Sequence, residues 1–167
     1  MASPASIKDH PIHPMLVALP LGLWTFALVC DIARIAGGGR AWSTVALYCT
    51  AAGIVSAVLA AVPGLIDYFS IEEAEMKEIA TTHLICGVGS VAIFTLNLWS
   101  RYRLADGSAV PLMLSIAGVL IAVFGGWLGG EMVYRKGMAV AAVEELAKQV
   151  ARQEKEKAKD RTLRRAG

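Results

Sequence analysis

The sequence predicts an all-α integral membrane protein, a four-helix bundle whose helices run up, down, up and down. The chain of 167 residues is 56% hydrophobic and only 18% charged, whereas a soluble domain is usually about half apolar and about a quarter charged. The apolar residues gather in four runs, each about long enough for a helix to cross roughly 30 Å of hydrocarbon. Short connections favour neighbouring helices of opposite direction. The runs are Met15–Ala36, Ala41–Val62, Ile79–Trp99 and Val110–Trp127.

The chain divides into two parts by composition. We expect residues 1–137 to form the four-helix transmembrane domain and residues 138–167 to form a charged helical tail at the membrane surface. Four crossings put both termini on the same side of the membrane, which we expect to be a bacterial inner membrane. The first thirteen residues lack the regions of a signal peptide, so the first span is expected to be an uncleaved anchor. The net charge of +2 gives no reason to expect a nucleic-acid partner.

The entry to the first span is the motif His10-Pro11-Ile12-His13-Pro14. A residue before proline is biased toward extended backbone, and proline itself suits the first turn of a helix. We therefore expect His13 near the N-cap of the first helix and His10 just outside it on an extended arm. Pro20, inside the run, predicts a kink. At the other end of the run, Asp31 and Arg34 are three residues apart, which predicts a local ion pair.

The second and third spans meet at the same membrane surface. Pro63 and Gly64 are expected to interrupt the second helix shortly before Asp67. The sequence from Ser70 to Glu73 has the pattern of a capping box, with a serine followed three residues later by a glutamate, and predicts that the third helix begins there. His83 then lies about one turn inside the third apolar run.

The fourth span is rich in glycine. Gly118, Ala122, Gly126 and Gly130 follow one another at four-residue intervals, and Gly125 and Gly129 form a parallel row. Small residues let helix backbones approach closely in lipid, so we expect this helix to be the most tightly packed of the four. The paired glycines near its end also leave room for a flat group.

The up-and-down topology gathers six polar residues at one membrane surface. The first and second spans form one helical hairpin, and the third and fourth spans form another. The two hairpins look like a weak parallel repeat, because each begins with a histidine and ends with an acid. The interval between the histidines is similar to the interval between the acids but not equal to it. The six residues are His10, His13, Asp67, His83, Glu131 and Arg135.

These motifs, in this order, resemble the domain-of-unknown-function 2231 (DUF2231) family of predicted bacterial membrane proteins. The resemblance covers roughly Lys8 to Met138 and not the tail. It implies a membrane domain with no established activity. Some members carry a Rieske-type iron–sulfur domain after the fourth helix, and the family is loosely similar to b-type cytochrome bundles, so the resemblance suggests electron transfer. The matching segments are His10–Pro14 with Leu19–Gly22, Val62–Tyr68, His83, and Gly125–Glu131 with Tyr134–Arg135.

Three hypotheses for the function follow. The first is a single b-type haem in an electron-transfer component of the membrane, with His83 as one axial ligand and His13 or His10 as the other. Gly87, Gly129 and Gly130 would then leave room for the flat ring. All three histidines are expected at one surface, which excludes two haems stacked across the membrane. A redox protein would be the partner of such a component, besides the lipid bilayer itself.

The other two hypotheses use the same residues differently. A metal ion would be bound by three imidazoles and a carboxylate, although the spacing matches no familiar metal motif. Alternatively, the polar residues serve only as structural glue in a complex subunit or homo-oligomer, where they cap helices and Arg135 neutralises Asp67 or Glu131. The sequence identifies no catalytic residues and leaves open whether the protein is an enzyme. The candidate metal ligands are His10, His13, His83, Asp67 and Glu131.

Overall fold

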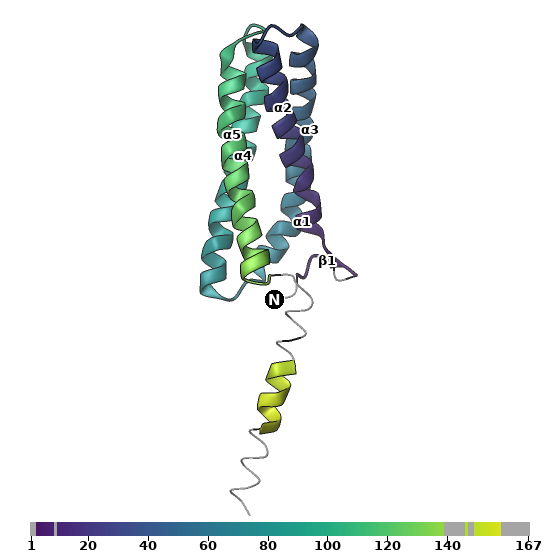
Figure 1. The fold of residues 1–167 in the computed structure, drawn as a ribbon, viewed down its shortest axis with the longest axis vertical. Helices are drawn as coiled ribbons and strands as arrows, with labels where there is room; N and C mark the ends of the chain where they lie inside the picture. Colours follow the sequence, from purple (N-terminus) through teal and green to yellow (C-terminus); the bar gives the residue numbers. More distant parts are fainter. Residues whose placement is uncertain (1–2, 9, 139–145, 147–148, 158–167) are drawn as a thin grey trace, which may run out of the picture.

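The protein is a bundle of four long helices, as a computed structural model shows (Figure 1). The structure describes residues 3–8, 10–138, 146 and 149–157. Each of the four spans is long and apolar enough to cross a membrane, and the all-α fold class is confirmed. The elements are β1 (Ser6–Ile7), β2 (His10–Pro11), α1 (Ile12–Leu16), α2 (Ala18–Ile35), α3 (Arg40–Phe69), α4 (Ala74–Arg103), α5 (Ala109–Gly130) and a π-helical turn, η1 (Glu131–Arg135).

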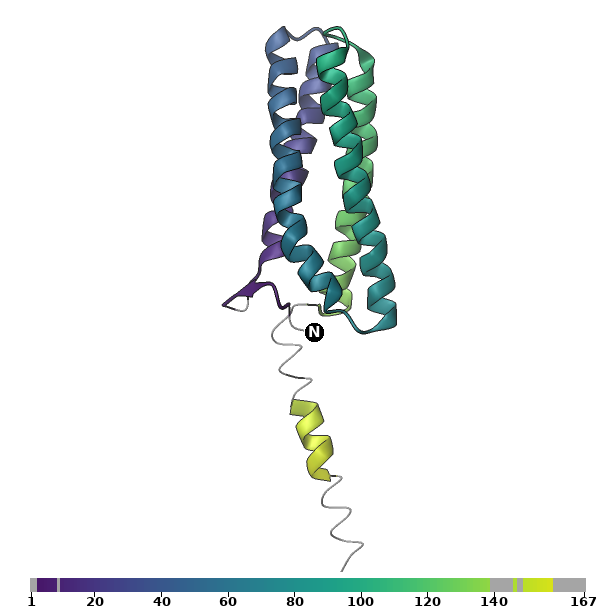
Figure 2. The same cartoon turned by 180° about the vertical axis from the view of Figure 1, so that it is seen from behind.

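The helices alternate in direction. The connections between α2 and α3 and between α4 and α5 lie at one end of the bundle, and the connection between α3 and α4 lies at the other end, beside the N-terminal arm (Figures 1 and 2). We call these the arginine end and the histidine end, after the side chains described below. Of the expected tail, residues 149–157 are helical, and residues 139–145, 147–148 and 158–167 lie outside the described part of the chain.

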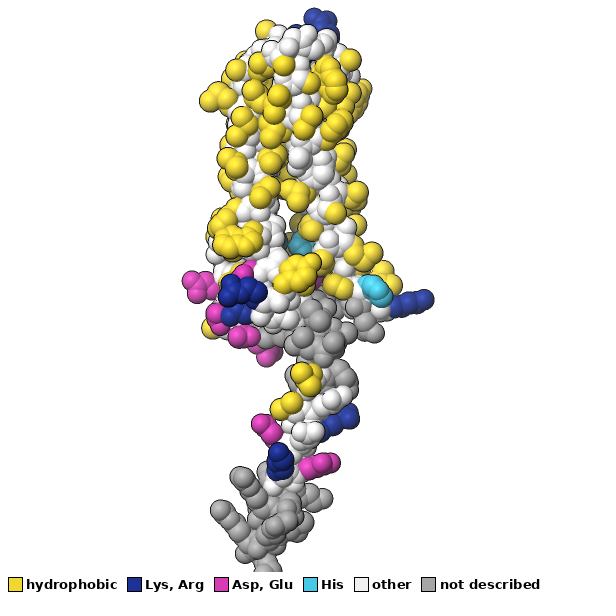
Figure 3. Space-filling view, viewed as in Figure 1, with side chains coloured by type: hydrophobic (Ala, Val, Ile, Leu, Met, Phe, Trp, Pro, Cys, Tyr) yellow, Lys and Arg dark blue, Asp and Glu magenta, His cyan; other side chains and the backbone are white. Residues whose placement is uncertain are grey.

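The outer surface of the bundle is apolar. Large hydrophobic side chains point away from the interior along every span, for example Val55, Ile85 and Leu120, which are 61%, 65% and 65% exposed. Figure 3 shows hydrophobic side chains covering the shaft, with most of the charged ones below it. Exposed apolar surface of this extent is rare on soluble proteins. It suits a chain whose four helices face lipid.

Three pairs of side chains meet in the centre of the bundle, each between the first helix of one hairpin and the first helix of the other. The interval along the chain is the same in every pair (13 to 83, 24 to 94, 31 to 101). The weak repeat in the sequence is therefore a real repeat of packing. The pairs are His13 with His83, Trp24 stacked on Phe94 at 4.2 Å between ring centroids, and Asp31 with Arg101.

Equivalent positions in the second helices of the hairpins, α3 and α5, are separated by a shorter interval along the chain. Gly53 and Gly118 are one such pair of positions. Gly53 faces the ring of Trp24, and Gly118 faces the ring of Phe94. At this interval Asp67 corresponds to Met132, and both are buried. The expected equivalence of Asp67 with Glu131 is thus wrong by a single position.

The glycines of α5 divide between two faces. A Cβ at Gly118 would lie 2.6 Å from the Phe94 ring, whereas a Cβ at Gly126 would have nothing within 4 Å. The row that faces the bundle runs through Gly118, Gly125 and Gly129, and the prediction that Gly126 and Gly130 continue it is wrong. A helix has about 3.6 residues per turn, so steps of four drift around it, while alternating steps of four and three stay on one face.

The prolines act differently from each other. Pro20 has no N–H for the carbonyl of Leu16, so α1 and α2 meet at Val17 without that hydrogen bond, while the backbone of Val17 stays helical and the span continues from Ile12 to Ile35. The expected kink at Pro20 stays a prediction. Pro63 lies inside α3, which continues unbroken to Phe69. The expected interruption at Pro63 is therefore wrong.

The start of the third span also differs from the prediction. The helix α4 begins at Ala74 with Glu73 as its N-cap, and no side chain caps it. The Ser70 hydroxyl instead donates to the carbonyl of Asp67 at 2.7 Å. Ser70 therefore closes the end of α3 and is not part of a capping box.

A buried ion pair joins the hairpins at the arginine end. The Arg101 guanidinium donates to both carboxylate oxygens of Asp31, at 2.8 and 2.7 Å, and the side chains are only 6% and 7% exposed. The Ser115 hydroxyl donates to the same carboxylate at 2.6 Å, and Arg101 also donates to Asn97 at 2.7 Å. Residues from α2, α4 and α5 thus meet in one hydrogen-bonded network.

The predicted local pair of Asp31 with Arg34 is wrong. Asp31 faces the interior, where Arg101 reaches it, while Arg34 donates to Asp106 in the connection between α4 and α5 at 3.1 Å. This hydrogen bond, with a second from Ser43, holds the pKa of Asp106 well below its usual range. Ion pairs therefore tie the hairpins together both inside the bundle and at its surface, where Arg40 also pairs with Asp106 at 3.3 Å.

We expect Gly118→Ala to destabilise the bundle by about 1–3 kcal/mol, because the Phe94 ring is fully buried and stacked and cannot move away from the added methyl group. Gly126→Ala is the matched control on the same helix. Unfolding of both variants by denaturant in detergent measures the difference. Equal stability of the two variants would show that Phe94 adjusts freely.

We expect Asp31→Ala and Arg101→Ala each to cost about 3–5 kcal/mol, because each leaves a buried charge without its partner. The double variant Asp31→Ala/Arg101→Ala should lose clearly less than the sum of the single losses. A double-mutant cycle in the same unfolding assay tests this coupling. Additive losses would mean that the two charges do not interact.

Candidate histidine site at one end of the bundle

His13 is held by the second helix of its own hairpin. It lies in the first turn of α1, and its Nδ1 is 2.8 Å from the carbonyl oxygen of Ala60 on α3. One turn further along α3, a Cβ at Gly64 would lie 2.7 Å from the same Nδ1. The ring therefore reaches the carbonyl only because residue 64 has no side chain.

His83 has the same arrangement in the second hairpin. Its Nδ1 is 2.7 Å from the carbonyl oxygen of Gly125 on α5, and a Cβ at Gly129 would lie 3.3 Å from its Cε1. Gly125 is the equivalent of Ala60, and Gly129 is the equivalent of Gly64, because both pairs are separated by the same interval as Gly53 and Gly118. Each imidazole is thus seated on a carbonyl and a glycine that lie one turn apart on the partner helix.

These hydrogen bonds determine which ring nitrogen carries the proton. A carbonyl oxygen only accepts, so Nδ1 is the donor in both rings, and a neutral imidazole then has an unprotonated Nε2. Among the described residues, no group bonds to Nε2 of either ring. The two ring centroids are 5.9 Å apart, with the ring planes at 90°. An imidazole whose N–H donates to a backbone carbonyl is the usual form of a metal-binding histidine.

The surroundings of the pair are open on one side. Figure 3 shows a hollow between the hairpins, just inside the histidine end, and a histidine side chain lies in it. Gly87 lies one turn after His83 on α4 and is exposed, and a Cβ there would have nothing within 4 Å. Gly130 contacts neither ring, because its only near neighbour among the described residues is the Tyr134 ring at 3.8 Å.

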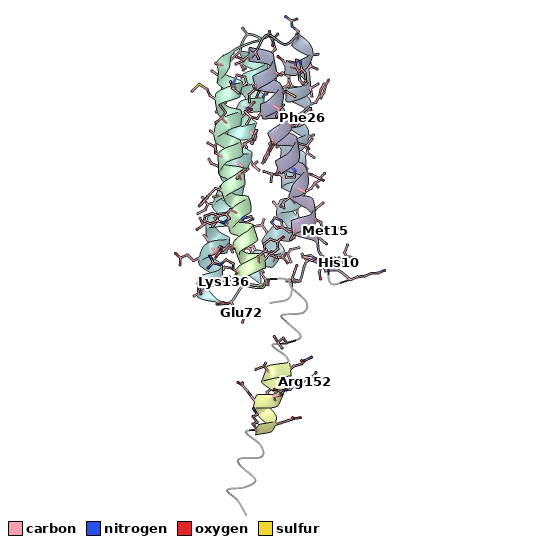
Figure 4. All side chains as sticks on the ribbon, viewed as in Figure 1. His10, Met15, Phe26, Glu72, Lys136 and Arg152 are labelled. Carbon is pink, nitrogen blue, oxygen red and sulfur yellow. The ribbon has the colours of Figure 1, made fainter. Side chains whose placement is uncertain are left out.

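His10 does not join the pair. It lies in β2 on the N-terminal arm, outside the bundle (Figure 4), where it is exposed and its Nδ1 donates to the carbonyl of Lys8 at 2.7 Å. Its extended backbone matches the prediction. The structure therefore brings together two of the three histidines.

The two acids among the candidate ligands, Asp67 and Glu131, have partners of their own. Asp67 accepts from the Ser3 hydroxyl at 2.7 Å and from the Ala5 N–H at 3.1 Å, and Glu131 pairs with Arg135 at 2.9 Å. Neither acid contacts an imidazole, because helix carbonyls accept the Nδ1–H of both rings. In the described part of the chain, no group of three or more His, Cys, Asp and Glu side chains could hold a metal ion.

The carbonyls of Ala60 and Gly125 are the site residues that the sequence did not reveal. A backbone acceptor leaves no trace in residue type. The available signal was the equal spacing of Gly64 and Gly129 after these positions, which becomes meaningful only when the interval between the second helices is known.

A family model described as a predicted membrane protein, DUF2231, matches residues 9–142. The chain belongs to the DUF2231 family. The match includes all four helices, both seated histidines and both glycines that support them. No curated protein and no solved structure matches the chain. The family and the four apolar helices make this DUF2231 chain a multi-pass membrane protein.

We expect Gly64→Ala to push the His13 ring away from the Ala60 carbonyl, because the added Cβ would lie 2.7 Å from Nδ1. Nuclear magnetic resonance of ¹⁵N-labelled histidine should then show faster exchange of the His13 Nδ1 proton with water. Gly87→Ala, which adds a methyl group in open space, is the control and should leave that proton unchanged. An unchanged His13 signal in Gly64→Ala would contradict the close seating of the ring.

Proposed function

We propose that this DUF2231 protein is an electron-transfer component of the membrane that holds a single b-type haem between His13 and His83. The observation that carries the proposal is the paired seating of the two rings. Both imidazoles donate Nδ1–H to a helix carbonyl and leave Nε2 unprotonated, which is the state that an axial ligand requires.

The number of donors favours haem over an ion held by the protein alone. A protein zinc site needs three or four ligands, and the described residues offer two imidazoles without a third ligand nearby. Haem needs only axial ligands from the protein, since the macrocycle supplies the others. A bound imidazole nitrogen lies about 2 Å from its metal, so rings facing one ion have centroids about 6 Å apart. The observed 5.9 Å agrees with this spacing.

Each residue of the site has a part in such binding. The carbonyls of Ala60 and Gly125 fix the orientation of the rings and make Nε2 a stronger donor. Gly64 and Gly129 let the rings reach these carbonyls, and Gly87 leaves free space beside His83. When bound, haem supplies one-electron chemistry. The apolar side chains of the bundle would limit contact of the bound group with water, which would influence its potential.

The setting of the site in the cell is part of the proposal. We place the protein in a bacterial inner membrane, with both termini on the same side because four spans cross it. A redox partner would approach at the histidine end, where the charged residues Glu72 and Lys136 lie (Figure 4).

The second candidate function is a purely structural role for the polar residues, and the partners of the two acids favour it. Asp67 and Glu131 each have partners within the chain, as helix-fixing groups would. In that reading the two imidazoles serve only to tie α1 to α3 and α4 to α5.

The test is cofactor content in three histidine variants. The protein is expressed with haem precursor, purified in detergent, and its absorption spectrum and metal content are measured. We expect a Soret band with one haem per chain in the wild type. His13→Ala and His83→Ala should lose most of it, whereas His10→Ala, on the exposed arm, is the matched control and should keep it.

The other outcomes separate the alternatives. A wild type with no Soret band, even after reconstitution with haem, would overturn the haem proposal. Bound zinc or another ion in that protein would then support the metal hypothesis. A protein free of both, in which His83→Ala lowers stability, would support the structural reading.

A further inference from the structure

The two histidines differ in their position along their helices. His83 lies well inside α4, a continuous helix of 30 residues. His13 is the second residue of α1 and so lies in the first turn of its span, which continues through the helical Val17 into α2. The first turn of a helix lacks helical partners for its N–H groups, and helix ends fray more readily than the interior. The seat of His13 therefore needs support that the seat of His83 does not.

That support comes from the N-terminal arm, residues 3–11, through a chain of hydrogen bonds. The Asp67 carboxylate on α3 accepts from the Ser3 hydroxyl and from the Ala5 N–H. The carbonyl of Ala5 in turn accepts from the N–H of Ile12, at the start of α1, at 3.0 Å. Ala5 is thus bonded on one side to α3 and on the other side to the helix that carries His13.

The contact between the arm and Asp67 is buried. Asp67 is 6% exposed, and Ser3 and Ala5 are each 8% exposed. A buried carboxylate that loses its hydrogen-bond donors is costly, so the arm and Asp67 hold each other. Asp67 lies about two turns after Ala60, which seats the His13 ring, on the same face of α3. The helix α1 is therefore attached to one face of α3 at two points.

The second hairpin has no counterpart of this attachment among the described residues. At the interval between the second helices, the position of Asp67 is occupied by Met132, which packs in the apolar cluster with Ile71, Met76 and Ala80. An apolar side chain cannot accept the hydrogen bonds that Asp67 accepts. The second hairpin has instead the exposed ion pair of Glu75 and Lys136, which lies about two turns before His83 on α4, whereas Ala5 is bonded directly to the first turn that carries His13.

We propose that Asp67 is a positioning residue that latches the N-terminal arm and thereby holds His13 in its seat, so that His13 is the releasable member of the histidine pair and His83 the fixed one. The identity of the bound group rests on the proposed function, whereas the latch does not. If the pair held haem, opening the latch would release His13 while His83 stayed in place, and a small external ligand such as carbon monoxide could then bind instead of His13.

The first test needs no cofactor. Protein labelled with ¹⁵N-histidine has only three imidazoles to observe, and exchange of each Nδ1 proton with water is measured in detergent. In Asp67→Ala we expect exchange at His13 to rise by about tenfold or more, while exchange at His83 stays as in the wild type. Asp67→Asn keeps an oxygen that can accept both bonds and should restore the wild-type rate.

The matched control is Glu131→Ala, which removes an acid at the same end that pairs only with Arg135 among the described residues. It should leave exchange at His13 unchanged. Equal acceleration at His13 and His83 in Asp67→Ala would indicate general loosening and overturn the latch. So would an unchanged rate at His13, or an Asp67→Asn protein that behaves like Asp67→Ala.

The second test uses the haem-loaded protein. Asp67→Ala should shift the spectrum from low spin toward high spin and bind carbon monoxide faster than the wild type, and Glu131→Ala should do neither. If the wild type binds no haem, the proposed function fails, but the exchange experiment still decides the latch. If the wild type binds haem and Asp67→Ala leaves both spectrum and exchange unchanged, the latch fails and the proposed function stands.

Discussion

The hydrogen bond from an imidazole N–H to a helix carbonyl is the interaction on which the histidine end depends. A polar ring at membrane depth needs partners inside the protein, and each histidine finds one on the second helix of its own hairpin. The bond requires glycine one turn further on, at Gly64 and at Gly129, where a Cβ would crowd the ring. In the neutral imidazole it leaves the other nitrogen of each ring unprotonated, which is the form that metal-binding histidines take.

Two further pairs of side chains follow the pair of His13 and His83 along the axis of the bundle. The stacked rings of Trp24 and Phe94 follow it in the centre, and the ion pair of Asp31 and Arg101 completes it at the arginine end. A buried ion pair contributes little net stability because both charges lose water. A register that separated these two charges would, however, be strongly disfavoured. We therefore assign to the pair the role of fixing how the two hairpins slide against each other.

The repeat makes the differences between the hairpins informative. Both hairpins seat a histidine on a carbonyl with glycine one turn later, but His13 lies in the first turn of its span while His83 lies well inside the continuous helix α4. The buried acid Asp67 occurs only in the first hairpin, where it holds the N-terminal arm, and the apolar Met132 takes its place in the second. The contact of Asp67 with the N-terminal arm thus lies in the hairpin whose histidine needs support. Two hairpins of similar packing therefore hold their histidines in different ways.

Local patterns were enough to predict the four spans and the gathering of His13 and His83 at one end, because apolar run length and helix direction are properties of the chain itself. The partners of the polar groups were beyond such reasoning. Asp31 meets Arg101 and His13 meets the Ala60 carbonyl, and both partners lie far along the chain on another helix. The nearer Arg34 misled the prediction because spacing along one helix does not tell which face turns inward. Which glycines of α5 face the bundle was likewise decided by packing between helices. Backbone acceptors carry no signature in residue type, so only the tertiary structure decided where the imidazole protons go.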